Sequence, residues 1–149
     1  NVAVMDSAAR ASMTTFAERK MGDVLLTWEN EALVTMKTLG KKDFEIVYPS
    51  ISILTEPSVA IVDKTVEKNK NKWLATGYIN YLYSPLGQDM AAKHFYRPHN
   101  EKVLARYSAQ FPKLKTFTID EVFGGWAKAQ QVHFVNDGVF DQIYNKKKR

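Results

Sequence analysis

The sequence has few segments with the pattern of a β-strand, and a sheet of so few strands limits the folds that the chain can form by itself. Short apolar segments bounded by glycine, proline or charged residues predict about four strands, at 23–28, 44–48, 58–62 and 117–119. Helical patterns are expected over residues 8–20, 30–39, 64–83, 85–94, 101–110 and 120–136. Strand–helix alternation followed by a helix-rich second half indicates an α/β protein. Several apolar helices would lack cover on so small a sheet, so the chain is predicted to be part of a fold.

The composition is that of a globular protein with a basic end. Of the 149 residues, 45% are apolar and 25% are charged, which argues against a disordered chain. The net charge is +5, and four of the positive charges are the last four residues, 146–149. The remaining body is nearly neutral, so the basic isoelectric point is a weak argument for a nucleic-acid surface. No apolar run approaches the ~20 residues of a membrane-spanning helix.

The usual catalytic and metal-binding patterns are missing from the sequence. There is no cysteine, which excludes disulfides and thiolate ligands. His94, His99 and His133 have no metal-ligand spacing, and ordinary surface or core positions are expected for them. Gly124-Gly125 lacks the lysine of a phosphate loop and is interpreted as a packing feature of a helix below Trp126. We therefore expect a protein that is not an enzyme and that needs no cofactor.

One segment has the features of an anion site at the start of a helix. Ser7, Ala8, Ala9 and Arg10 follow the apolar run Val2–Met5, and Ser7 is a good helix N-cap. The backbone N–H groups of a first helical turn have no partner inside the helix, and the helix dipole favours an anion there. Small alanine side chains would let a compact anion approach. The alternative is that Ser7 only caps the helix and the alanines pack.

A second candidate donor is Trp28, at the end of the predicted strand 23–28. Ligands of open α/β sheets bind beyond the carboxyl ends of strands, and an indole N–H can donate but not accept. Glu29 and Glu31 follow directly, and their charges would repel an anion unless they point away. The alternative is a tryptophan that serves only packing.

These segments resemble a known family, the periplasmic sulfate-binding proteins of ABC transporters. The similar blocks lie in residues 6–10, 16–19, 22–32, 83–88, 96–98, 111–114, 117–121 and 123–126. They cover nearly the whole chain. Members of the family are much longer, and this sequence is similar to their C-terminal half.

The resemblance implies a two-lobed periplasmic binding protein of type II, lacking here the N-terminal half, that closes on sulfate like a clamp. Residues 1–47 would belong to one lobe and residues 48–149 to the other. The family pattern implies that the backbone N–H of Ala9 and the indole N–H of Trp28 bind sulfate. Arg10 would support the turn from behind, and Ser7 would support it or cap the helix.

The resemblance also implies partners and a location. The intact protein would deliver sulfate, or thiosulfate, to a membrane permease of an ABC importer from the periplasm, with the signal peptide outside this chain. The chain alone would pair with the missing half or with itself to cover its apolar faces. The competing interpretations are a nucleic-acid or polyanion binder that uses the basic tail, and an enzyme of unassigned type. Neither has supporting motifs.

Overall fold

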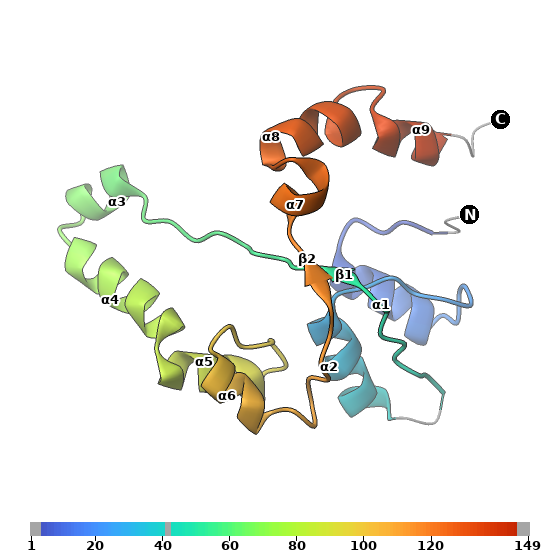
Figure 1. The fold of residues 1–149 in the computed structure, drawn as a ribbon, viewed down its shortest axis with the longest axis horizontal. Helices are drawn as coiled ribbons and strands as arrows, with labels where there is room; N and C mark the ends of the chain where they lie inside the picture. Colours follow the sequence, from blue (N-terminus) through green and yellow to red (C-terminus); the bar gives the residue numbers. More distant parts are fainter. Residues whose placement is uncertain (1–3, 41–42, 146–149) are drawn as a thin grey trace. The chain divides into compact units, whose positions relative to one another are not determined.

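The computed structural model describes residues 4–40 and 43–145 of the chain. They form two compact units, each made from separate stretches of sequence (Figure 1). We call residues 4–40, 43–46 and 57–113 the helical unit, and residues 47–56 and 114–145 the strand unit. The expected division of the intact protein into lobes at residue 48 stays a prediction.

The helical unit contains six helices among its described residues. They are α1 (Ala9–Ala17), α2 (Glu29–Leu39), α3 (Asp63–Lys68), α4 (Lys72–Tyr83), α5 (Pro85–Lys93) and α6 (Glu101–Arg106). The turn from α4 into α5 follows the sequence signal: Ser84 Oγ accepts a hydrogen bond from the N–H of Gly87 at 3.1 Å, and Pro85 is the first helical residue. Asn100 caps α6 in the same way, through the N–H of Val103.

The core of the helical unit is small. Its buried apolar side chains are Met13, Val66, Ala92, Val103 and Phe111. Many larger apolar side chains of the same unit lie at the surface. Trp73 on α4 is an example, because 76% of this residue is exposed. Little of the unit's apolar surface is therefore removed from water, and burial supplies correspondingly little of the favourable free energy of folding.

The strand unit is built on one parallel pair of two-residue strands. β1 (Ser52–Ile53) pairs with β2 (Thr116–Phe117) in the register Ser52 to Thr116. Four helical segments follow, α7 (Ile119–Phe123), α8 (Trp126–Ala129), the π-helical turn η1 (Gln130–Phe134) and α9 (Val139–Asn145). Thr118 begins α7 with a capping box, in which its hydroxyl accepts from the N–H of Glu121 and the Glu121 carboxylate accepts from the N–H of Thr118.

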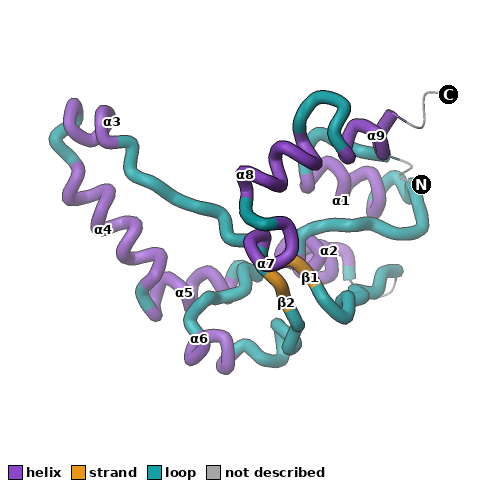
Figure 2. Tube along the Cα trace, turned by 45° about the horizontal axis from the view of Figure 1, so that its top comes forward, coloured by secondary structure: helices purple, strands orange, loops and turns teal. Residues whose placement is uncertain are grey.

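Three of the four predicted strands do not form in the described chain. Residues 23–28, 44–48 and 58–62 lie outside helices and strands, and Figure 2 shows how little of the chain is strand. Only the prediction at 117–119 overlaps a described strand, and it does so at Phe117 alone, because β2 is Thr116–Phe117 and α7 begins at Ile119. A strand requires a neighbour to accept and donate its backbone hydrogen bonds. The apolar segments are present, but partner strands for them are not among the described residues.

Two predicted helices are interrupted at residues with positive φ. The helix expected over 64–83 is divided into α3 and α4 by a turn in which Lys70 has a φ of 53°. The helix expected over 120–136 ends at Gly124 and Gly125, whose φ values are 70° and 88°. The glycine pair thus breaks the helix instead of packing within it, because its backbone lies in the left-handed region. The helical segments found among the described residues are all too short or too polar to span a membrane.

Candidate functional site

The two predicted donors lie at the starts of α1 and α2. Ala9 is the first residue of α1, after the extended N-cap Ala8, and Trp28 is the extended N-cap of α2. Neither helix has a side-chain cap. The first N–H groups of each helix therefore have no partner inside the helix and no capping oxygen from the preceding residue.

The prediction that Ser7 caps α1 is wrong. The helix begins one residue later than expected, so that Ala8 takes the N-cap position and no side chain caps the turn. Ser7 precedes the cap and is exposed. The supporting role of Ser7 beside the first turn of α1 stays a prediction.

Arg10 connects the first turns of the two helices. Its Nε lies 2.9 Å from Glu31 Oε2, and its terminal nitrogen donates to Glu31 Oε1 at 3.2 Å. The arginine side chain is largely exposed, whereas 13% of the Glu31 side chain is exposed. The ion pair joins the first turn of α1, which begins with Ala9, to the first turn of α2, whose N-cap is Trp28.

A second arginine, outside the predicted site residues, holds the neighbouring carboxylate. Arg97 donates from Nε to Glu29 Oε2 at 2.9 Å and from a terminal nitrogen to Glu29 Oε1 at 2.6 Å. About a quarter of each side chain is exposed, 25% and 23%. The only sequence signal was the Tyr96-Arg97-Pro98 block of the resemblance, because the partners are 68 residues apart.

The two ion pairs offset the repulsion that the carboxylates of Glu29 and Glu31 would exert on an anion beside Trp28. Glu29 and Glu31 both lie in the first turn of α2, where their charges would oppose a bound anion. Each is paired with a guanidinium, so the acidic turn is neutralised locally. Trp28 itself is 53% exposed, and none of the described residues accepts a hydrogen bond from its indole.

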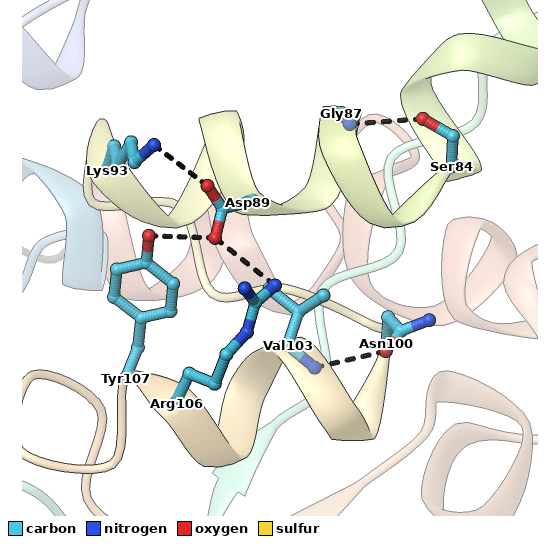
Figure 3. A network of polar contacts seen from close by, with 8 residues as sticks. All are labelled: Ser84, Gly87, Asp89, Lys93, Asn100, Val103, Arg106 and Tyr107. Carbon is cyan, nitrogen blue, oxygen red and sulfur yellow. Dashed lines mark hydrogen bonds and ion pairs between the residues drawn. The ribbon is translucent and has the colours of Figure 1, made fainter.

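The segment that carries Arg97 runs between α5 and α6, which a polar network joins (Figure 3). Asp89 accepts a hydrogen bond from the Tyr107 hydroxyl at 3.0 Å and pairs with Lys93 at 2.9 Å and Arg106 at 3.2 Å. The hydrogen bonds from Lys93 and Tyr107 lower the pKa of Asp89. The Asp89 hydrogen bond raises the pKa of Lys93, and burial raises that of Tyr107. The network holds α6 against α5.

A shallow groove lies along α1 and α2, but most of it is away from the two first turns. Its lining residues are Arg10, Met13, Thr14, Ala17, Glu18, Val34, Thr35, Thr38 and Leu39. Only Arg10 among them belongs to the first turn of a helix. Within the described residues no group of three or more histidine and acidic side chains could hold a metal ion.

Comparison with known proteins identifies the family. The sequence profile of the family described as bacterial extracellular solute-binding protein matches residues 1–97, well over half of the chain. The chain belongs to this family. Membership implies a periplasmic binding protein fold, and the described residues of this chain are mostly helical with one pair of short strands.

Several curated relatives of this solute-binding protein are similar over nearly all of the chain. It is 62% identical to the sulfate-binding protein of Salmonella typhimurium and 60% identical to that of Escherichia coli, in both cases over 96% of the chain and 44% of the relative. The thiosulfate-binding protein of Pseudomonas aeruginosa is 46% identical over 97% of the chain and 43% of its own length. The chain thus spans less than half the length of these relatives, and all three are named as binding proteins and not as enzymes.

Proposed function

We propose that the chain forms part of the sulfate site of a solute-binding protein that serves an ABC importer in the periplasm. In this proposal the backbone N–H of Ala9 and the indole N–H of Trp28 donate to the anion, and Ser7 and Arg10 support the turn. The intact protein has the two-lobed type II fold, and residues 1–47 and 48–149 contribute to different lobes. In this proposal an N-terminal half outside this chain supplies the remaining donors and the missing strands.

The pairing of both first-turn carboxylates of α2 is the observation that carries this proposal. An anion beside Trp28 would otherwise meet Glu29 and Glu31 at short range. With Arg97 and Arg10 bound to them, the turn presents uncharged N–H donors and the positive end of a helix dipole. This environment suits an anion whose charge is held by hydrogen bonds and not by a direct counterion.

A site that offers only hydrogen-bond donors distinguishes tetrahedral anions by whether they carry a proton. Sulfate carries no proton at neutral pH, so each of its oxygens can accept. Hydrogen phosphate carries a proton that needs an acceptor, and a site without one leaves a buried donor unpaired at a cost of ~1–3 kcal/mol. Thiosulfate is a dianion without a proton as well. Relatives named for sulfate and for thiosulfate support both as ligands.

The test uses a chimera, because this chain spans 44% of the length of its relatives. In the chimera this chain replaces the 143 matching residues of the Salmonella typhimurium sulfate-binding protein. Sulfate, thiosulfate and phosphate are titrated separately by calorimetry in sulfate-free buffer, against the chimera and against the chain alone. We expect saturable binding of sulfate or thiosulfate to the chimera and no saturable binding of phosphate.

Substitution of the indole donor then tests the assigned residue. Trp28→Phe should weaken sulfate binding about ten- to a hundredfold, the effect of losing one hydrogen bond to a charged group. Trp73→Phe is the matched control, since Trp73 is an exposed tryptophan on α4 and far along the chain from both turns. Equal sulfate affinities for Trp28→Phe and Trp73→Phe would refute the role of Trp28. A chimera that binds none of the anions would refute the proposed function.

A further inference from the structure

Arg97 is held on two sides in a manner unlike the exposed arginines of the chain. Its guanidinium makes two parallel hydrogen bonds to Glu29, at 2.9 Å and 2.6 Å, and lies 5.2 Å from the centre of the Phe111 ring. Phe111 is one of the few buried side chains of the helical unit. An arginine placed between a carboxylate and a buried aromatic ring has a fixed orientation.

The backbone before Arg97 is fixed by a strained helix end. The N–H of Tyr96 donates to Ala91 O at 2.9 Å and the N–H of Phe95 to Ala92 O at 3.0 Å, which is the hydrogen-bond pattern of a Schellman motif. The position that usually holds glycine in this motif is Phe95, with a φ of 67°. The Lys37 ammonium of α2 lies 5.3 Å from the centre of the Phe95 ring. Residues 95–97 therefore contact both ends of α2. Phe95 contacts Lys37 in the last turn, and Arg97 binds Glu29 in the first turn.

The backbone after Arg97 is held by Gln88 of α5. The amide oxygen of Gln88 accepts from the N–H of His99 at 2.6 Å and of Asn100 at 3.3 Å, and its amide nitrogen donates to Leu82 O at 2.8 Å. Both flanks of Arg97 are thus attached to α5. The position of Arg97 is therefore set by backbone hydrogen bonds on both sides of it, in addition to the ion pair with Glu29.

Glu29 is the residue that needs such an arginine. It is the first residue of α2, directly after Trp28, where a free carboxylate would be attracted to the unpaired N–H groups and the positive end of the helix dipole. A carboxylate in that place competes with an anionic ligand for the same donors. It also repels a dianion.

We propose that Arg97 is a positioning residue of the anion site: it draws the Glu29 carboxylate away from the first turn of α2 and cancels its charge, so that the donors at Trp28 stay open to the ligand. This inference rests on the proposed function. It differs from a general stabilising role, because it assigns Glu29 as a residue whose free charge would inhibit binding.

The test measures sulfate affinity in the chimera for single and double variants. Arg97→Gln should weaken sulfate binding about tenfold, the repulsion expected between a unit charge and a dianion about 10 Å apart at an effective dielectric constant of about 50. Glu29→Gln should leave the affinity unchanged or increase it. The double variant Arg97→Gln with Glu29→Gln should recover affinity to within about threefold of the unsubstituted chimera. Arg19→Gln, an exposed arginine on the same unit, controls for net charge and should have no effect.

Ionic strength supplies a readout that a purely structural role would not move. The loss caused by Arg97→Gln should shrink when salt is raised from 0.02 to about 0.5 M, because the free Glu29 charge is screened. Arg97→Lys, which keeps the charge without the parallel hydrogen bonds, should fall between the unsubstituted chimera and Arg97→Gln. Thermal melts of each variant verify folding, and the double variant and Arg97→Lys carry the test if Arg97→Gln does not fold.

The outcomes separate this inference from the proposed function. If Glu29→Gln weakens binding as much as Arg97→Gln, and the double variant recovers nothing, Arg97 acts only by holding the fold and the inference is wrong. If the chimera binds sulfate and no variant changes the affinity, the inference alone is wrong. If the unsubstituted chimera binds no anion, the proposed function and the inference are both wrong.

Discussion

The corner between α4 and α5 contains a glycine that the structure predicts to be irreplaceable. A Cβ added to Gly87 would overlap the carbonyl oxygen of Tyr81 and would lie 3.0 Å from its carbonyl carbon and 3.2 Å from Leu82 Cα. All of these are backbone atoms, so no side-chain rotation relieves the overlap. The Ser84 hydroxyl, which donates to Tyr81 O at 2.7 Å and accepts from the N–H of Gly87, would be displaced. Gly87→Ala should therefore open this corner.

The expected magnitude follows from three contributions. Overpacking against atoms that cannot move costs about 1–3 kcal/mol. Loss of the Ser84 cap costs about 1 kcal/mol more. Alanine in place of glycine inside a helix returns about 0.8–1 kcal/mol. Gly87→Ala should thus reduce the free energy of unfolding by about 2 kcal/mol, in spite of the better helix propensity of alanine.

Gly77 provides a control of the opposite sign. It lies within α4, and a Cβ added there has no atom within 4 Å. Gly77→Ala should therefore increase the free energy of unfolding by about 0.5–1 kcal/mol. Urea denaturation followed by far-UV circular dichroism measures both variants in the chimera, against the unsubstituted chimera. A Gly87→Ala chimera as stable as the unsubstituted one, or two variants destabilised alike, would refute the reasoning.

Two further predictions concern caps and pH. Thr118→Ala should reduce the free energy of unfolding by about 1 kcal/mol in the same urea assay, because α7 loses the hydroxyl of its capping box; a loss below about 0.3 kcal/mol would contradict this. The N–H and hydroxyl of Thr118 lower the pKa of Glu121, and Lys93 lowers that of Asp89. Their stabilisation is present above the unfolded carboxyl pKa of about 4 and is lost as pH falls through the lowered folded values. Glu121→Gln should flatten this acid dependence of stability, measured by urea titrations between pH 2 and 6.

The sequence predicted best what is determined within one turn of helix. The start of α5 at Pro85 is confirmed, since the hydrogen bonds of the Ser84 hydroxyl join Tyr81 O and the N–H of Gly87, each three residues away. The end of α2 at Leu39 is confirmed as well, and Gly40 follows it with a φ of 86°. Ser7 shows the limit of such signals. Its hydroxyl is a good N-cap, but Ala8 takes the N-cap position with an extended backbone, and α1 begins at Ala9.

The contacts around the candidate site could not be predicted from the sequence. Arg10 and Glu31 are 21 residues apart, and Arg97 and Glu29 are 68 apart. Charged residues of both signs occur throughout the chain, and nothing local selects these pairs. The sequence therefore identified Glu29 and Glu31 as an obstacle to anion binding, whereas their partners depend on how α1 and the segment between α5 and α6 lie against α2.

The strands were predicted wrongly for a reason that bears on the site itself. Segment 23–28 has the apolar residues of a strand, but Val24 is 80% and Leu26 is 90% exposed, because no described strand lies beside it. Trp28 ends this segment and is the N-cap of α2. On its helical side the backbone of Trp28 is continuous with α2, and on its strand side no described strand pairs with it. The position of this donor therefore depends on α2 in the described chain, and the strand ladder that would hold it from the other side needs a partner strand.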